Sequence, residues 1–239
     1  MKASIVLLVG TVQEKLVLKN EGIQNSWISE NAHSVEEVIM EIKGVELMGD
    51  NLRSLVNYCG KGVRLYPLCK MIHPGTAKLD DHCQIFDFVF IDAGAKLQIG
   101  KYSTLTWYTL IEGGAETIIG DRVFIGPGTK VLTSSYKLDG YYTVEHLPGD
   151  CNGIDYGNIE ICDDAYIGAG CTILPGSYIG EGAVVGSNSL VKGRLEPWTV
   201  YVGTPCRPIR KRIPPTKERA EKIQEIDWTK HFDVNNLAE

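Results

Sequence analysis

Four side chains of this chain are candidates for proton-transfer chemistry: Asp92, His82, Glu116 and His146. Carboxylates and imidazoles take up and release protons, which is the task of a general base. A carboxylate can also hold an amine and lower the cost of its deprotonation. We therefore consider these four residues as catalytic candidates, with Asp92 first.

Each candidate has a structural alternative. His82 can be a polar residue on an outer surface, and His146 can be a solvated residue of a long loop. Glu116 and Glu112 flank a glycine pair, and solvation alone accounts for both nearly as well. Asp92 stands apart because it occupies a position where the repeat described below favours glycine.

A basic stretch near the C-terminus contains Arg207, Arg210, Lys211 and Arg212. Guanidinium and ammonium groups bind phosphate through charge-assisted hydrogen bonds. The stretch is therefore a candidate phosphate-binding segment, and a solvated surface is its alternative.

The composition excludes several classes of protein. The 239 residues carry a net charge of −6, which gives no indication of a nucleic-acid-binding surface. Seven cysteines without a C-x-x-C pair are typical of a reducing cytosol. The apolar run from Ile5 to Val9 is shorter than a signal-peptide core, and no run approaches the ~20 apolar residues of a membrane span. We expect a soluble, cytoplasmic protein.

From Leu79 onward the sequence repeats every six residues, a period that fits neither a helix nor an alternating strand. Fifteen positions of the repeat are Ile, Leu or Val: Leu79, Ile85, Ile91, Ile99, Leu105, Ile111, Ile119, Ile125, Val131, Ile161, Ile167, Ile173, Ile179, Val185 and Val191. Four residues after each stands a residue that is in most cases Ala, Ser, Thr or Cys. The pattern predicts a prism of short strands, three per turn, in which each aliphatic residue points to the axis and the small residue fits inside a corner.

Two kinds of insertion interrupt the repeat. The pairs Leu97-Gln98 and Thr117-Ile118 lie 20 residues apart, so we expect them to stack at the same corner. A longer interruption runs from Ser134 to Asn158, and the repeat resumes in phase after it. This segment must leave the prism as a loop, and its tyrosines and histidine favour a functional role.

The sequence thus predicts three regions. Residues 1–62 form a small α/β segment, residues 63–212 form the prism with an extended loop at 134–158, and residues 213–239 form a helical tail. Within the tail, a helix is expected over Thr216 to Ile226.

The repeat from Leu79 to Arg212 resembles that of the left-handed parallel β-helix acyltransferases, the hexapeptide-repeat family. The closing stretch, from Ile173-Leu174-Pro175-Gly176 through Val202-Gly203-Thr204-Pro205 to Arg212, is similar to the tail of the sugar and xenobiotic acetyltransferases in that family. The resemblance implies a mainly β fold, a left-handed parallel β-helix with a small N-terminal α/β segment and a C-terminal helix. It also implies a homotrimer with active sites between subunits.

Residues 81–95 resemble the segment that opens the prism in N-acetyltransferases of nucleotide-linked 4-amino-deoxy sugars. In those enzymes a histidine beside an acidic residue serves the sugar amine. Here Asp81 precedes His82, and Asp92 lies one hexapeptide further on. The resemblance implies acyl transfer from coenzyme A to the amine of a sugar such as dTDP-4-amino-4,6-dideoxyglucose, in the biosynthesis of lipopolysaccharide or another surface glycan.

Ser134 to Gly140 is similar to the loop of the xenobiotic acetyltransferases, but Tyr136 stands where their catalytic histidine would be. We therefore place amine activation on Asp92, with His82 as its nearest functional neighbour and Glu116 as a second carboxylate. If the chemistry belongs to the loop instead, His146 is its candidate.

The family match places the basic stretch beside the last coils, where it implies contacts with the phosphates of coenzyme A. We expect acetyl-CoA or another acyl-CoA as co-substrate, held by Arg207, Arg210 and Lys211. Gly168-Ala169 and Gly186-Ser187 would leave the outer wall low enough for the pantetheine arm.

Three other functions compete with this one. O-acetylation of a sugar or polysaccharide is the nearest, and a non-catalytic β-helix scaffold is another. A zinc carbonic anhydrase needs three converging imidazoles. Only two of the five histidines lie in the repeat and its loop, with no close pair, so no metal site is expected.

Overall fold

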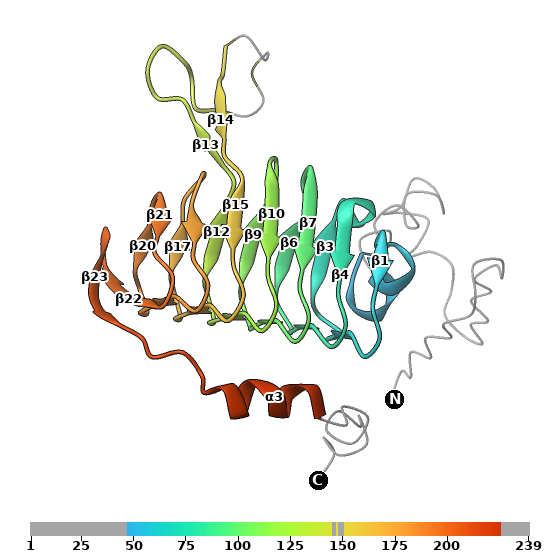
Figure 1. Ribbon diagram of the computed structural model, residues 1–239. Helices are drawn as coiled ribbons and strands as arrows, with labels where there is room; N and C mark the ends of the chain where they lie inside the picture. Colours follow the sequence, from blue (N-terminus) through green and yellow to red (C-terminus); the bar gives the residue numbers. More distant parts are fainter. Residues whose placement is uncertain (1–46, 145–146, 148–150, 226–239) are drawn as a thin grey trace, which may run out of the picture. The chain divides into compact units, whose positions relative to one another are not determined.

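A computed structural model describes residues 47–144, 147 and 151–225. Within this part, short strands stack in successive coils to form three parallel sheets, one on each face of a β-helix (Figure 1). The parallel β-helix expected from the six-residue period is therefore confirmed.

Each of the first six coils contributes one strand to each sheet, and the last coil contributes β21 and β22. The first sheet contains β1 (Tyr58–Cys59), β4 (Ala77–Leu79), β7 (Lys96–Ile99), β10 (Glu116–Ile119), β15 (Ile159–Ile161), β18 (Tyr178–Ile179) and β21 (Arg194–Leu195). The second contains β2 (Arg64–Leu65), β5 (Gln84–Ile85), β8 (Thr104–Leu105), β11 (Phe124–Ile125), β16 (Tyr166–Ile167), β19 (Val184–Val185), β22 (Thr199–Gly203) and β23 (Cys206–Lys211). The third contains β3 (Lys70–Ile72), β6 (Phe90–Asp92), β9 (Leu110–Glu112), β12 (Lys130–Leu132), β17 (Thr172–Ile173) and β20 (Leu190–Val191).

The core is a stack of the predicted aliphatic residues. All fifteen have at most 1% of their surface exposed, and each pairs in register with its equivalent in the next coil, as Ile85 does with Leu105 and Leu105 with Ile125. The small residues four positions later are buried in thirteen cases, Ala95 and Ser135 being exposed. Both exceptions lie at the corner between the third and first sheets.

That corner is wider than the others in the coils with insertions. Eight residues separate Ile91 from Ile99 there, against six from Ile173 to Ile179 in a later coil. The added length turns Leu97 inward, and Leu97 pairs with Thr117, so the insertions do stack at one corner. Buried residues on either side of Ala95 take its place in the core. The exposed bend at Ala95 is therefore available for a site.

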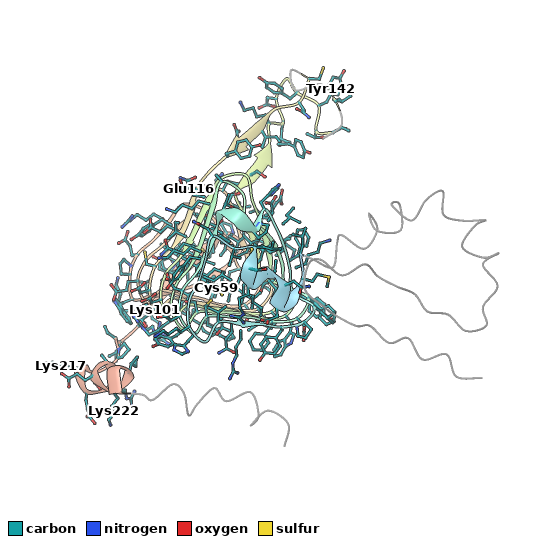
Figure 2. The ribbon with its side chains drawn as sticks, turned by 90° about the vertical axis from the view of Figure 1, so that its right-hand side faces the viewer. Cys59, Lys101, Glu116, Tyr142, Lys217 and Lys222 are labelled. Atoms are coloured by element: carbon teal, nitrogen blue, oxygen red, sulfur yellow. The ribbon has the colours of Figure 1, made fainter. Side chains whose placement is uncertain are left out.

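The long interruption leaves the helix at the same corner. It forms an antiparallel hairpin of β13 (Ser134–Tyr136) and β14 (Ile154–Tyr156) that projects from the sheets. Figure 2 shows Tyr142 at the far end of this hairpin. His146 lies outside the described residues.

The β-helix begins one coil before the recognised repeat, with β1, β2 and β3. Leu65 and Met71 occupy inward positions of this coil, and the 3₁₀ helix η1 (Gly49–Ser54) precedes it. A second 3₁₀ turn, η2 (Pro74–Thr76), follows β3. Most of the α/β segment expected in residues 1–62 lies outside the described residues.

At the other end, β23 returns antiparallel to β22 and closes the second sheet. The C-terminal helix is confirmed as α3 (Lys217–Glu225). In the described part of the chain, no helix has the length and apolar character needed to cross a bilayer.

Candidate functional site

A cavity of about 530 Å³ lies at the wide corner between the third and first sheets. Its floor comes from three successive coils, through His73, Asp92, Gly94, Glu112, Gly113 and Gly114. Its wall comes from the foot of the hairpin, through Ser134, Ser135, Tyr136, Ile154 and Tyr156. The bends of the wide corner and the foot of the hairpin thus build one site.

Glycine allows the coils to approach closely at the floor. A Cβ atom on Gly113 would lie 2.6 Å from Cα of Gly94, and one on Gly114 would lie 2.6 Å from Cε1 of Tyr156. Gly114 also has a φ of +127°, which side chains disfavour. The backbone is therefore bare at the floor, and the ring of Tyr156 packs directly on it.

A histidine–aspartate pair lies in this cavity. Nδ1 of His73 is 2.7 Å from Oδ1 of Asp92, and the same carboxylate oxygen accepts a hydrogen bond of 3.0 Å from the amide of Gly94. The Asp92 side chain is 23% exposed and that of His73 is 66% exposed. An ionised carboxylate can only accept, so Nδ1 donates, and Nε2 of a neutral His73 carries the lone pair that can take a proton.

Glu112 contributes a second carboxylate to the cavity. It ends β9, next to β6, which ends with Asp92. The hydroxyl of Ser134 donates a hydrogen bond of 3.3 Å to Oε1 of Glu112. The foot of the hairpin and the floor of the cavity are therefore joined at this glutamate.

Of the four predicted catalytic candidates, the structure places Asp92 in the cavity. The imidazole beside Asp92 belongs to His73, whereas His82 lies at the corner between the first and second sheets. There its ring stacks on Tyr102, with ring centroids 5.3 Å apart and planes 6° from parallel.

Glu116 begins β10, on the side from which the hairpin leaves (Figure 2). Its amide donates a hydrogen bond of 3.1 Å to Oδ1 of Asn158, and Glu116 is not among the described residues that line the cavity. Asp92, His82 and Glu116 are thus not brought together.

Sequence reasoning missed His73 as a candidate because the recognised repeat begins only at Leu79. A signal was present, since Met71 lies 20 residues before Ile91 and fills the same inward position. Extending the coil back by that step places Ile72 opposite Asp92, with His73 next to it.

Cysteine chemistry does not fit this site. Burial raises the pKa of the Cys69 thiol to about 11 and raises the pKa of Cys83 further. A high pKa suppresses the nucleophilic thiolate. Neither cysteine is among the described residues that line the cavity, and no cluster of metal-ligating side chains occurs within the described ranges.

The small residues proposed for the pantetheine arm do lie together. Gly168 and Ser187 are on successive coils, because a Cβ atom on Gly168 would lie 2.5 Å from the amide nitrogen of Ser187. A Cβ atom on Gly186 would in turn lie 2.7 Å from Cγ1 of Val202, which pairs with Arg207. Gly168-Ala169, Gly186-Ser187 and Arg207 therefore form one continuous column at the corner between the second and third sheets.

The other basic residues lie farther along β23. Arg210 pairs with Val200, and Nζ of Lys211 donates a hydrogen bond of 2.9 Å to the hydroxyl of Thr199. With about 3.3 Å of rise per residue, Arg207 and Lys211 are roughly 13 Å apart along the strand. The basic stretch is therefore an extended row of charges.

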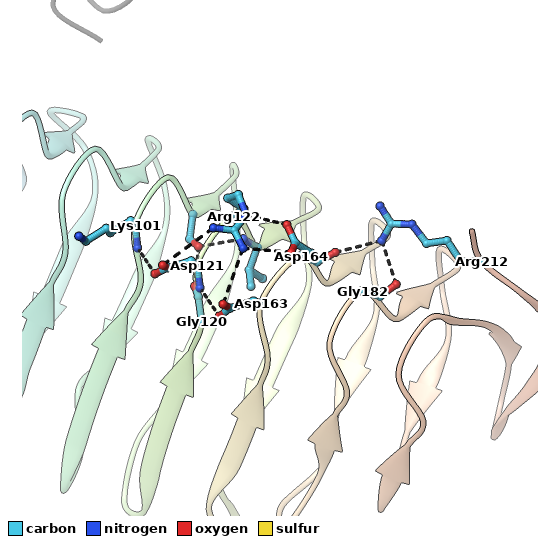
Figure 3. Close-up of polar contacts among 10 residues, drawn as sticks. Lys101, Gly120, Asp121, Arg122, Asp163, Asp164, Gly182 and Arg212 are labelled. Carbon is cyan, nitrogen blue, oxygen red and sulfur yellow. Dashed lines mark hydrogen bonds and ion pairs between the residues drawn. The ribbon is translucent and has the colours of Figure 1, made fainter. Parts of the chain in front are cut away.

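Arg212 has a structural role. Its guanidinium donates hydrogen bonds of 3.0 Å to the carbonyl of Asp164 and 2.9 Å to that of Gly182 (Figure 3). In the same region Arg122 makes a bidentate contact with Asp164, with distances of 2.7 and 3.0 Å. Arg212 thus joins the chain after β23 to the stacked corners.

Comparison with known proteins agrees with this fold. The family model of the bacterial transferase hexapeptide (six repeats) matches residues 158–193. A probable macrolide acetyltransferase of Lysinibacillus sphaericus is 30% identical over 152 residues, which cover 54% of this chain and 79% of that protein. A dTDP-4-amino-4,6-dideoxy-D-glucose acyltransferase of Escherichia coli is 27% identical over 195 residues, which cover 81% and 92%.

Relatives with other acceptors also match. A putative lipopolysaccharide biosynthesis O-acetyl transferase of Escherichia coli K12 is 29% identical over 169 residues, covering 71% of this chain and 73% of that protein. Among solved structures, the N-acyltransferase AntD of Bacillus cereus in complex with dTDP and 3-hydroxybutyryl-CoA superimposes with a TM-score of 0.65. It is 26% identical, and the match covers 83% of this chain and 97% of that one. With a β-helix built on the same repeat, the chain belongs to the hexapeptide-repeat acyltransferases.

Proposed function

We propose that the protein transfers an acyl group from coenzyme A to the amine of a nucleotide-linked amino-deoxy sugar, with dTDP-4-amino-4,6-dideoxyglucose as the representative acceptor. The observation that carries this proposal is the His73–Asp92 pair, 2.7 Å apart in a cavity of about 530 Å³. The similarity to the E. coli acyltransferase and to AntD supports the choice of acceptor.

The residues of the cavity have separate roles in amide formation. The thioester of acyl-CoA supplies the activated acyl group. The lone pair of the neutral sugar amine forms the C–N bond as the C–S bond breaks, and Nε2 of His73 takes the proton that the nitrogen loses in this step. Asp92 holds Nδ1–H and stabilises the imidazolium that results. The proton on Nε2 is then available to the departing thiolate of coenzyme A.

The fit to coenzyme A rests on the column at the corner between the second and third sheets. Ala169 and Ser187 present short side chains there, so a thin pantetheine arm can lie near the backbone. Arg207 lies at the end of this column, with Arg210 and Lys211 farther along β23. These positive charges are suited to the phosphates.

Replacing Arg207, Arg210 and Lys211 together with glutamine is expected to raise the KM for acyl-CoA by about 10- to 100-fold, because charge-assisted hydrogen bonds are lost. The KM for the sugar should stay nearly the same. Steady-state kinetics with each substrate varied in turn measures both constants. Glutamine replacements at the exposed Lys217, Arg219 and Lys222 of α3 remove the same charge and serve as the control. An unchanged donor KM in the first variant would show that the row is only solvated surface.

We also propose a cytoplasmic homotrimer. The hairpin carries apolar side chains outward, with Leu138 78% exposed and Tyr142 68% exposed. The resemblance to the family puts active sites between subunits, and the cavity and the Gly168–Ser187 column lie at opposite edges of the third sheet. Multi-angle light scattering at micromolar concentration should give three times the chain mass of 26.4 kDa. A monomer would contradict the assembly.

A thiol-release assay over a panel of nucleotide-linked amino sugars and acyl-CoA donors tests the function. Release is expected with 4-amino-4,6-dideoxy sugars, and their hydroxyl counterparts should give little. The relative named as an O-acetyl transferase makes ester formation the second candidate. Faster release with the hydroxyl sugars would favour it. No release with any pair, together with no thermal shift on adding coenzyme A, would support a scaffold.

A further inference from the structure

The side chains of Asp92 and Glu112 project from the same face of the third sheet, one coil apart. Ile91 pairs with Ile111, and both are fully buried, so the residue after each points outward because side chains alternate along a strand. Neighbouring strands are about 4.8 Å apart, which makes the two carboxylates close neighbours at the floor of the cavity.

The two carboxylates have different partners. Oδ1 of Asp92 already accepts hydrogen bonds from His73 and from the amide of Gly94. Glu112 is exposed, and the neutral hydroxyl of Ser134 donates a hydrogen bond to its Oε1. In the part of the chain that the structure describes, no lysine, arginine or histidine forms an ion pair with Glu112.

The lining of the cavity carries a net negative charge. Its described lining contains the carboxylates of Asp92 and Glu112 and no lysine or arginine. Such a cavity favours a positively charged group, and the bond from Ser134 holds one oxygen of Glu112 so that the other can receive it. A sugar amine is protonated in part at neutral pH, whereas a hydroxyl group at the same carbon carries no charge.

We propose that Glu112 determines the preference for an amine acceptor by binding its ammonium group, one strand away from Asp92 and two strands away from His73. This inference rests on the proposed function and extends it. Glu112 receives the charged amine through a charge-assisted hydrogen bond, and the ammonium releases one proton to solvent to become the neutral amine. Nε2 of His73 then takes the second proton as the C–N bond forms and passes it to the thiolate of coenzyme A. A hydroxyl acceptor gains nothing from the carboxylate.

The test removes the charge of Glu112 from the protein and compares the effect on a ligand that carries an amine with the effect on a ligand that carries a hydroxyl group instead. The probes are dTDP-4-amino-4,6-dideoxyglucose as substrate and the same nucleotide sugar with a hydroxyl group in place of the amine as competitive inhibitor. Glu112→Gln is expected to raise the KM for the amine by about 10- to 100-fold. The Ki of the hydroxyl sugar, the KM for acyl-CoA and kcat should each change by less than about threefold, because none of them depends on holding the charge.

Two further variants sharpen the comparison. Glu112→Asp keeps the charge on a shorter side chain, so it should retain most of the preference for the amine. Glu160→Gln removes an exposed carboxylate on β15, away from the cavity lining, and should change neither constant. Thermal melting checks that all three variants are folded.

Equal weakening of the amine and the hydroxyl sugar in Glu112→Gln would overturn the proposal, because Glu112 would then only shape the cavity. An unchanged KM for the amine would overturn it as well. A wild-type protein that neither acylates the amino sugar nor binds it would instead refute the proposed function, whatever the variants do.

Discussion

Replacing His73 with asparagine is expected to lower kcat by about 10²- to 10⁴-fold, the usual contribution of a general base. Asparagine is the suitable replacement because His73 has a φ of +54°, in the left-handed region that asparagine tolerates. The change removes Nε2 and keeps the local backbone. Turnover measured with both substrates saturating, together with a melting temperature close to that of the wild type, separates lost catalysis from lost folding.

His82→Asn is the matched control for this prediction. His82 also has a left-handed backbone, with a φ of +59°, but its ring stacks on Tyr102 at a different corner. The same substitution there should reduce kcat much less. Turnover near the wild-type value in His73→Asn would contradict the assignment of the base. A larger loss in His82→Asn would return the chemistry to the histidine that the sequence analysis placed beside Asp92.

Asp92→Asn is expected to lower kcat by about 10²-fold, at the low end of general-base effects. The amide oxygen can still accept the hydrogen bond from Gly94, which is 3.0 Å from Oδ1 in the structure. The negative charge that stabilises the His73 imidazolium is lost. Because the shape is kept, the KM for acyl-CoA should remain close to its wild-type value in steady-state kinetics.

The double variant His73→Asn, Asp92→Asn tests whether the two residues act as one unit. If Asp92 works through His73, the double variant should be about as slow as His73→Asn alone, because coupled residues are not additive. Multiplied losses would show that Asp92 acts independently. Wild-type turnover in Asp92→Asn would remove it from the mechanism.

The fold was predictable because the sequence signal for its core is local. The aliphatic residues from Leu79 to Val191 recur every six residues except at the insertions and the long loop, and each pairs in register with its equivalents in neighbouring coils, so the period specifies the stack. The insertions at Leu97-Gln98 and Thr117-Ile118 lie 20 residues apart, and this spacing predicted their common corner.

The site was predictable only in part. Asp92 stood out because it replaces glycine in the repeat. His73 and Glu112 reach the same cavity through stacking of coils, which brings together residues about 20 positions apart. His73 lies in a coil where methionine replaces the usual aliphatic residue at position 71, so the repeat was not recognised there. The walls come from the hairpin, whose path the period does not describe.

The most direct test of the account is to identify the product formed from acetyl-CoA and dTDP-4-amino-4,6-dideoxyglucose by mass spectrometry and NMR, with the wild-type protein and with His73→Asn. The account predicts one acetyl group joined to the sugar nitrogen as an amide, in an amount equal to the thiol released, and almost none with the variant. An ester on a sugar hydroxyl, or equal amounts of amide with both proteins, would contradict it.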